Sequence, residues 1–468
     1  MDLPSHADVA GVSAAAEGPD VSRFRGHAFN LGAGRGPVRK PTPGRPVDNG
    51  DVASPMPSDT VGQSWSPWRV VAGFGAVSLA ADMVYEGARS VTGPLLASLG
   101  ASAVLVGLVS GAGEAMALLL RIVSGSWADR SGRYWSLTFA GYAMTAICVP
   151  ALAITPFIAG AGLALACVLI LGERVGKAVR SPSKTALLAH AAAVVGLGRG
   201  FGVHKALDQA GAVAGPLLVA AVTAAAGAIW PAMAVLAVPG AMALLILAWI
   251  RRSMGDPVKR GDEAAQTGAG YDPESRQGRL SKSHGRLPVV FWLFAAASAA
   301  TTAGLVTFAV IAYHLTQDHV VRVAAVPLIY AAAMAAAALA ALGSGWLFDR
   351  TRGRVLLGLP LLVAAVPALA FAGSPLIATT GALLWGAAGG VLDSSIKALV
   401  ADLVPASRLA TAYGVFAAVQ GAAAIGGGVM AGALYERSLP LLISAVAVTQ
   451  VVALVLLIAT LHRHQSSV

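Results

Sequence analysis

Charged side chains are scarce in this chain. They make up 12% of its 468 residues, while 56% of the residues are hydrophobic. A soluble domain usually carries about 25% charged residues. The apolar residues also come in blocks of about twenty, the length at which a helix crosses a hydrocarbon core of ~30 Å. The composition therefore excludes an ordinary soluble protein and predicts an all-α protein that crosses a membrane many times.

Cysteine is nearly absent. Cys148 and Cys167 each lie inside an apolar block, so they form no disulfide framework or metal cluster and are expected to pack as small hydrophobic side chains. The segment GERVGK (172–177) looks like a phosphate-binding loop, but it is one residue short between its glycines. In addition, Ala178 stands where a Ser or Thr must meet Mg²⁺. We therefore expect no cofactor, no metal site and no enzymatic activity.

Acidic residues are outnumbered, and the formal net charge is +10. A basic excess can indicate nucleic-acid binding, but here the basic residues lie in the connections between apolar blocks, and mostly on one side of them. Positive residues stay on the cytoplasmic side of a membrane. We therefore expect both termini to be cytoplasmic, and nucleic acid is not an expected partner.

Hydropathy predicts twelve membrane spans in two sets of six. The first six are 70–92, 103–126, 135–154, 157–178, 202–225 and 230–250. The second six are 289–314, 324–346, 355–373, 376–396, 410–432 and 439–461. The chain is accordingly divided into a disordered cytoplasmic N-terminal tail (1–68), a first six-helix bundle (69–250), a cytoplasmic linker (251–287), a second six-helix bundle (288–462) and a C-terminal tail (463–468).

The two halves repeat one another. Gly215 recurs as Gly427 at the same place in the second half, and GSWADRSGR (125–133) recurs as GWLFDRTRGR (345–354), one residue longer. Two six-helix halves in the same orientation imply a pseudo-two-fold axis along the membrane normal. Such an arrangement predicts a substrate site near the bilayer midplane, between the halves.

With these motifs the chain resembles the major facilitator superfamily over residues 70–460, and in particular an exporter-like bacterial branch of it. The loop after the second predicted span is similar to the superfamily signature Gly-x-x-x-Asp-Arg-x-Gly-Arg, and a weaker copy follows the eighth span. The resemblance implies a gate in which Asp129 closes the cytoplasmic face, with Arg180 as its candidate partner. The alternative is that the loop only fixes topology. The gate residues are Gly125, Asp129, Arg130, Gly132, Arg133 and Arg180, with Asp349 and Arg350 in the weaker copy.

Residues 211–216 (GAVAGP) resemble the Gly-x-x-x-Gly-Pro element of superfamily exporters. Through this resemblance Gly211, Gly215 and Pro216 imply export. From their spacing alone they have another interpretation, since small residues four apart let two helices approach closely and a proline kinks a span.

Ionisable residues occur inside the predicted spans, where each costs ~2.5 kcal/mol or more if it faces lipid. Asp82 is near the midplane of the first span, Glu86 follows one turn later, and Arg89 lies three residues beyond Glu86. Glu114 lies at mid-depth in the second span. Arg89 is expected to pair with Glu86, which leaves Asp82 and Glu114 without an obvious cation and able to carry a proton.

The fifth span begins with a second ionisable group. His204 lies one turn before Asp208 on the same helix face, so a local pair is expected. Lys205 is expected to extend toward the cytoplasmic surface. A structural and a functional role for this group both stay open.

These features predict a secondary transporter that exports a small organic molecule in exchange for protons by alternating access, functional as a monomer in the bacterial cytoplasmic membrane. Its expected partners are the substrate, protons and the lipid bilayer. Two alternatives stay open: a proton-coupled uptake symporter, and a non-transporting receptor or assembly factor that kept the fold. From their depth in the predicted spans alone, five residues of the second half are expected to contribute to substrate binding: Thr301, Thr302, Tyr330, Trp385 and Gln420.

Overall fold

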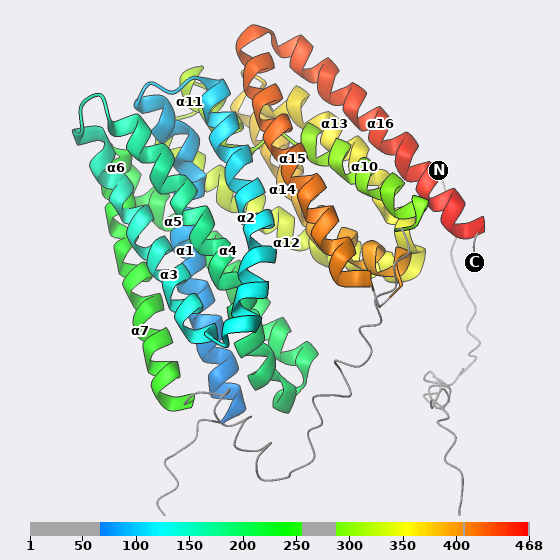
Figure 1. The fold of residues 1–468 in the computed structure, drawn as a ribbon. Helices are drawn as coiled ribbons and strands as arrows, with labels where there is room; N and C mark the ends of the chain where they lie inside the picture. The colour runs from blue at the N-terminus through cyan, green and yellow to red at the C-terminus, as the bar shows by residue number, and fades with distance from the viewer. Residues whose placement is uncertain (1–65, 255–286, 406–407, 467–468) are drawn as a thin grey trace, which may run out of the picture. The chain divides into compact units, whose positions relative to one another are not determined.

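The computed structural model describes residues 66–254, 287–405 and 408–466, and every regular element in them is helical (Figure 1). The predicted N-terminal tail up to residue 65, linker residues 255–286 and the last two residues lie outside the described part of the chain. The predicted boundaries of the tails and the linker therefore stay predictions.

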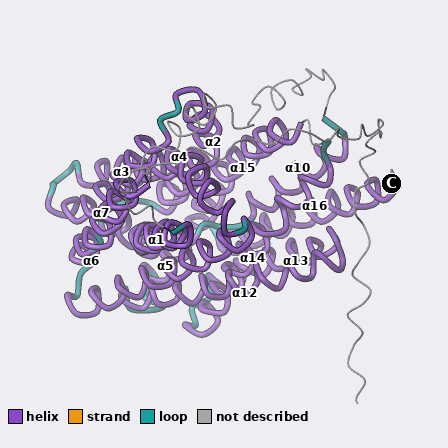
Figure 2. The backbone as a smooth tube through the Cα atoms, turned by 90° about the horizontal axis from the view of Figure 1, so that it is seen from below, coloured by secondary structure: helices purple, strands orange, loops and turns teal. Residues whose placement is uncertain are grey.

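Each predicted span corresponds to one helix or to two short helices in succession (Figure 2). The first half contains α1 (Pro67–Ser98), α2 (Ala103–Ser131), α3 (Tyr134–Ala151) with the 3-10 helix η2 (Leu152–Phe157), α4 (Gly162–Val195), α5 (Leu197–Ala226), and α6 (Ile229–Val235) followed by α7 (Ala237–Met254). The second half contains α10 (Val289–Gly304) with α11 (Phe308–Gln317), η3 (Val323–Ala325) with α12 (Val326–Thr351), η4 (Arg352–Leu357) with α13 (Gly358–Ala370), α14 (Pro375–Leu403), α15 (Leu409–Arg437) and α16 (Leu439–Ser466).

Eleven stretches of the described residues are long and apolar enough to cross a membrane, and α4 is the twelfth span. The prediction of an all-α protein with twelve transmembrane helices is confirmed. The predicted end of α4 at residue 178 is wrong, because the helix continues to Val195. Basic residues such as Arg180 were assigned to a cytoplasmic loop after this span, yet Arg180 is only 4% exposed. Neighbouring helices bury these charges, so α4 continues through them.

One glycine of the signature loop, Gly132, ends helix α2. Gly132 has a φ of 64°, in the left-handed region, and its N–H donates to the Ala128 carbonyl oxygen over 2.9 Å. A residue with a Cβ atom is strained in this conformation, whereas glycine is not. The turn that joins α2 to α3 therefore requires glycine at this position.

The structure repeats the helix packing of one half in the other. In the first half, a Cβ atom on Gly215 of α5 would collide with the backbone of Met83 in α1. In the second half, a Cβ on Gly427 of α15 would collide with the backbone of Ala303 in α10. The repeated glycine thus permits the same close helix contact in both halves.

The two halves contact each other along α2 and α15, which lie side by side (Figures 1 and 2). Toward the start of α2, Gly107 faces the backbone of Gly428, and Gly111 faces the backbone of Ala424, so close that a Cβ atom on either α2 glycine would collide. We call this contact the α2–α15 seam.

A second contact between the halves joins α5 to α12. The Gln209 side-chain amide of α5 donates to the Met334 carbonyl oxygen of α12 over 3.0 Å.

Candidate functional site

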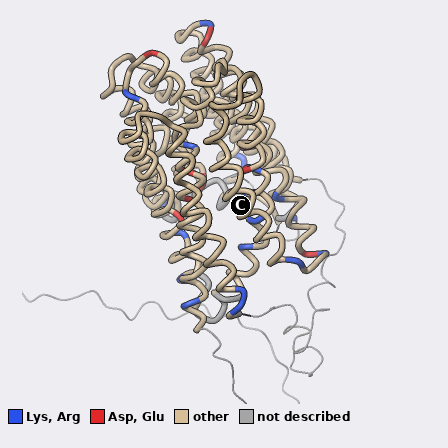
Figure 3. Tube along the Cα trace, turned by 90° about the vertical axis from the view of Figure 1, so that its left-hand side faces the viewer, with Lys and Arg blue, Asp and Glu red and all other residues tan. Residues whose placement is uncertain are grey.

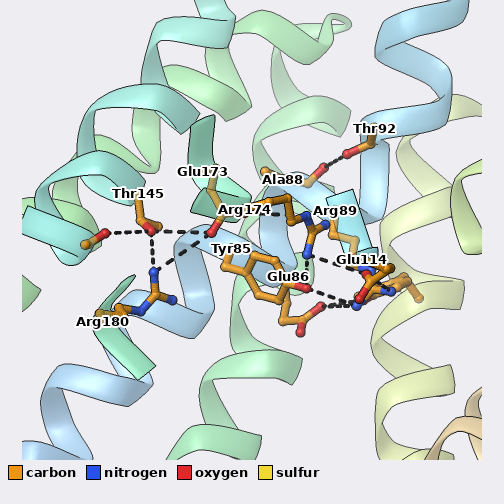
Figure 4. Close-up of polar contacts among 12 residues, drawn as sticks. Tyr85, Glu86, Ala88, Arg89, Thr92, Glu114, Thr145, Glu173, Arg174 and Arg180 are labelled. Atoms are coloured by element: carbon orange, nitrogen blue, oxygen red, sulfur yellow. Dashed lines mark hydrogen bonds and ion pairs between the residues drawn. The ribbon is translucent and has the colours of Figure 1, made fainter. Parts of the chain in front are cut away.

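Charged residues lie at the helix ends and also midway along the helices (Figure 3). The inner group surrounds Tyr85 on α1, which is 2% exposed. Arg89 Nη1 donates to the Tyr85 hydroxyl over 3.1 Å, and Arg174 Nη1 of α4 donates to the same hydroxyl (Figure 4). Lys177 Nζ lies 3.5 Å from the centre of the Tyr85 ring. One aromatic side chain thus contacts three cations from two helices.

Three glutamates accompany these cations. Arg89 Nη2 lies 2.9 Å from Glu114 Oε1, and Arg174 Nη1 lies 3.6 Å from the same oxygen. Arg89 Nη1 is farther from Glu86 Oε2, at 3.9 Å. Arg174 Nε is 3.6 Å from Glu173 Oε2. We call the group the Tyr85 cluster; its members are Tyr85, Glu86, Arg89, Glu114, Glu173, Arg174, Lys177 and Arg180.

The expectation that Glu114 lacks a cationic partner is wrong, because two arginines contact it. Arg89 was expected to form an ion pair with Glu86, but its guanidinium lies closer to the Glu114 carboxylate. The second cation, Arg174, comes from α4, and only the packing of α4 against α1 and α2 brings it to Glu114. Pairing across helices depends on which faces meet, and one helix sequence does not reveal that.

Tyr330 connects the cluster to the second half. Its hydroxyl, on α12, donates to Glu86 Oε2. Tyr330 also packs against Phe308 and Trp385, with ring centres 4.6 and 6.1 Å away. Of the five second-half residues expected from depth, Tyr330 contacts the cluster directly. Trp385 supports Tyr330, and its indole N–H donates to a backbone carbonyl, that of Val306, over 2.8 Å.

Sequence reasoning missed four members of the cluster, namely Tyr85, Glu173, Arg174 and Lys177. The last three belong to GERVGK, which was considered only as a nucleotide-binding loop. Its signal was the presence of three ionisable residues within an otherwise apolar span. Arg180 continues this face of α4. Its Nη1 donates to the Thr145 hydroxyl over 2.5 Å and lies 4.0 Å from Glu173 Oε1.

The predicted contact between Arg180 and Asp129 is therefore not formed in this conformation. Asp129 is exposed and accepts a hydrogen bond from the Tyr134 hydroxyl over 3.0 Å. Arg180 is buried, and its guanidinium carbon lies 4.8 Å from the centre of the Tyr142 ring. The prediction placed Arg180 at the membrane surface because it assumed that the fourth span ended before it.

The other gate residues lie near the ends of α2 and α12. Arg130 and Arg133 are exposed, and Gly125 faces Pro182 of α4. In the weaker copy, the Arg350 guanidinium carbon lies 3.7 Å from the centre of the Trp346 ring. The Asp349 side chain lies outside the described residues. The gate role of this loop stays a prediction.

A second polar group joins α1 to α5. The carboxyl groups of Asp82 and Asp208 lie close enough to affect each other's charge, and Lys205 Nζ lies 2.7 Å from Asp208 Oδ2. We call the two acids the Asp82–Asp208 pair. The expected local pair of His204 with Asp208 is replaced by this arrangement, since His204 Nε2 instead lies 3.3 Å from Ser78 Oγ.

The Lys205 side chain is 72% exposed, as expected of a residue that extends outward, and its ammonium also contacts Asp208. The pair exists because α1 and α5 approach closely. A Cβ atom on Gly211 would collide with the Leu79 backbone, as one on Gly215 would with that of Met83. Pro216 follows within α5. The packing interpretation of GAVAGP thus has a direct structural basis, and its implication of export stays a prediction.

A small cavity lies beside the cluster, with a volume of about 20 Å³. Arg89, Arg174 and Glu173 contribute its polar wall, and Leu152 and Ile170 are among its apolar residues. A volume of this size holds about one water molecule. The cavity is therefore too small for an organic molecule in this conformation. Within the residues described, no group of three His, Cys, Asp or Glu side chains is arranged to hold a metal ion.

Comparison with known proteins decides the family. The chain matches the Major Facilitator Superfamily over residues 72–428, with a second match over residues 292–467. The chain belongs to the Major Facilitator Superfamily. It is 48% identical, over 412 residues, to uncharacterised proteins of Mycobacterium tuberculosis and Mycobacterium bovis, a match that covers 88% of this chain and 97% of each relative.

Solved structures of superfamily-like transporters share the fold. A peptide transporter has a TM-score of 0.64 at 15% identity and covers 85% of this chain and 95% of its own. The nucleoside transporter NupG has a TM-score of 0.63 at 13% identity and covers 84% of this chain and 99% of its own. An inward-facing bacterial homologue of the human lysosomal transporter Spinster has a TM-score of 0.58 at 17% identity, covering 85% and 96%. At these identities the likeness concerns the fold, so this superfamily member is a multi-pass membrane protein with a transporter architecture.

Proposed function

We propose that this superfamily member is a proton-coupled secondary transporter, which moves a small organic molecule across the bacterial cytoplasmic membrane by alternating access. The observation that carries the proposal is the proximity of the carboxyl groups of Asp82 and Asp208, on two helices that pack closely together. Two neighbouring carboxyl groups favour a state in which one of them holds a proton, because two close negative charges repel each other. The pair therefore offers a proton-binding site between α1 and α5.

The surroundings of the pair suit a proton that is bound and later released. The Asp208 side chain keeps 18% of its surface exposed, so water reaches it. The Lys205 ammonium at 2.7 Å stabilises the charged form of Asp208 and leaves the proton to Asp82. Asp82 is thus the proposed proton carrier, the role that the sequence analysis expected from its position near the midplane of the first span.

Alternating access requires contacts between the halves that break and form again. The Tyr330–Glu86 hydrogen bond, the Gln209–Met334 hydrogen bond and the α2–α15 seam are contacts of this kind. We place both termini and the linker on the cytoplasmic side, following the basic residues, and we expect a monomer to suffice.

The direction of transport has two candidates. Export follows from the likeness of GAVAGP to the element of superfamily exporters. Uptake by symport is favoured by a different observation, the electrostatic attraction between Asp82 and Lys177. When Asp82 is protonated, Lys177 lacks that neighbouring negative charge and can attract a substrate anion, so proton and substrate bind together.

The test is proton flux in proteoliposomes that contain a pH-sensitive dye, measured across a panel of small organic acids, amines and neutral molecules. Proton movement with the substrate indicates symport, and movement against it indicates export by exchange. Asp82→Asn is expected to abolish substrate flux driven by a pH gradient while exchange without a gradient survives, because exchange needs no proton release. Asp402→Asn makes the same change at an exposed position and serves as the control.

Glu114→Gln is expected to behave differently from Asp82→Asn. It removes the carboxylate that faces Arg89 and Arg174, so it should lower the yield of folded protein. If Asp82→Asn and Asp208→Asn both couple flux to protons like the wild type, the proposed proton site is wrong.

A further inference from the structure

Lys177 differs from the other cations of the Tyr85 cluster. Arg89, Arg174 and Arg180 each have a carboxylate oxygen within 4.0 Å. For the Lys177 ammonium, no such oxygen lies that close among the side chains that the structure describes. Asp82 and Glu86 attract it from farther away, and its nearest defined contact is the face of the Tyr85 ring.

The cluster as a whole carries an excess of positive charge. Its cations are Arg89, Arg174, Lys177 and Arg180, and its carboxylates are Glu86, Glu114 and Glu173. The excess corresponds to one cation, and Lys177 is the one without an adjacent carboxylate. An uncompensated cation inside a protein is costly unless an anion can reach it.

The members of the cluster differ in exposure. The side chains of Arg89 and Glu114 are 24% and 34% exposed, whereas those of Arg174 and Glu173 are 9% and 5% exposed. The cluster therefore has an inner part, Arg174 and Glu173, where charges neutralise each other, and an outer part, Arg89 and Glu114, that stays partly exposed. Lys177 is half-buried.

We propose that the outer part of the Tyr85 cluster binds the carboxylate of an organic anion, with Lys177 and Arg89 as its ligands and the Tyr85 ring beneath it. This proposal rests on the transporter function proposed above and names the substrate class. An ammonium provides three N–H donors and a guanidinium five, so the two side chains suit an incoming carboxylate. A cationic substrate would be repelled by the same charge excess.

The proton site regulates this anion site. Asp82 faces Asp208 of α5 and Lys177 of α4, with Glu86 on its own helix, and Lys205 and Lys184 act on Asp208. When the pair loses its proton, Asp82 becomes negative and partly neutralises Lys177, which weakens the attraction for a substrate anion. The anion affinity therefore falls as the pH rises and the pair deprotonates, and proton and anion move in the same direction.

The experiment measures equilibrium binding to the purified full-length protein, without any gradient. Benzoate, benzamide and benzamidine share one ring and differ in charge, so they isolate the effect of charge. Their affinities are measured by isothermal titration calorimetry and by thermal stabilisation in detergent. The proteins compared are the wild type, Lys177→Gln, Lys177→Arg and the surface control Arg437→Gln, which removes an exposed cation.

We expect benzoate to bind the wild type and Arg437→Gln equally, with benzamide and benzamidine much weaker. Lys177→Gln should lower benzoate affinity about tenfold or more, the effect of one lost charge-assisted hydrogen bond, and Lys177→Arg should retain most of it. Preference for benzamidine, equal benzoate affinity in Lys177→Gln, or no benzoate binding at ~10 mM would each overturn the anion site.

Flux assays distinguish failure of the anion site from failure of the proposed proton-coupled transport. Proton-coupled flux of an amine, without benzoate binding, refutes the anion site and leaves the Asp82–Asp208 pair in place. Benzoate binding that requires Lys177 but is identical in Asp82→Asn at all pH values supports the anion site and refutes its regulation by the proton site.

Discussion

The α2–α15 seam allows a mutation whose effect follows from one steric contact. A Cβ atom added to Gly428 would collide with the backbone oxygen of Gly107. A backbone oxygen within a helix cannot rotate away as a flexible side chain can, so Gly428→Ala must push α2 and α15 apart. Overpacking of this kind costs about 1 to 3 kcal/mol. Because the cost applies only when the seam is closed, the ratio of open to closed seam should rise roughly 5- to 150-fold.

A matched control lies two residues away on the same helix. Gly426 of α15 has open space around the position of an added Cβ atom, so Gly426→Ala makes the same change in helix propensity without a collision. The difference between the two variants isolates the steric effect from the intrinsic preference of alanine for helices.

The assay is the labelling rate of a cysteine placed at Val104 on α2, close to the seam. The Val104 N–H donates to Glu436 Oε1 of α15 over 3.3 Å, and the residue is half-buried, so opening the seam should expose it further. Cys148 and Cys167 are first replaced by alanine. A membrane-impermeant maleimide should react faster in Gly428→Ala than in Gly426→Ala, by up to the factor given above. Equal rates in the two variants would refute the reasoning, because the added methyl group would then have been accommodated without opening the seam.

Four further predictions concern other parts of the molecule. Cysteines at Ser253 and Ser438 should label from opposite faces of the membrane, and labelling from one face would contradict the topology. Asp129→Asn should increase labelling of cysteines behind the cytoplasmic seal, because it removes the charged contact of the proposed gate; unchanged accessibility with full transport would leave the loop a role in topology only. Gly132→Ala should lower stability by about 1 to 2 kcal/mol because its φ is 64°, which thermal unfolding in detergent measures. Glu173→Gln removes the carboxylate that contacts buried Arg180 and one of the two that contact Arg174, so it should destabilise by about 3 to 5 kcal/mol, seen as a lower unfolding temperature; an unchanged temperature would mean that the contact is dispensable.

The amino-acid sequence determined the number of spans and the repeat. Apolar blocks of twenty residues have one stable form in a bilayer, the helix, since lipid cannot satisfy the hydrogen-bonding groups of an open backbone. The sequence also predicted Asp82, Glu86, Arg89 and Glu114 as candidate site residues, because an ionisable group at mid-depth must face the protein interior. Neither inference needs to know which helix is the neighbour of which.

The partners of these residues were decided only by the tertiary structure. Glu114 was expected to be free and is held by Arg89 and Arg174, and Arg180 was expected at a surface gate and is buried beside Thr145. Both errors concern α4, whose charges ended the predicted span too early. A charge inside the membrane becomes tolerable when a neighbouring helix neutralises it, and hydropathy along one segment contains no information about that neighbour. Depth is a property of the chain's own sequence, whereas pairing depends on which helix faces pack together.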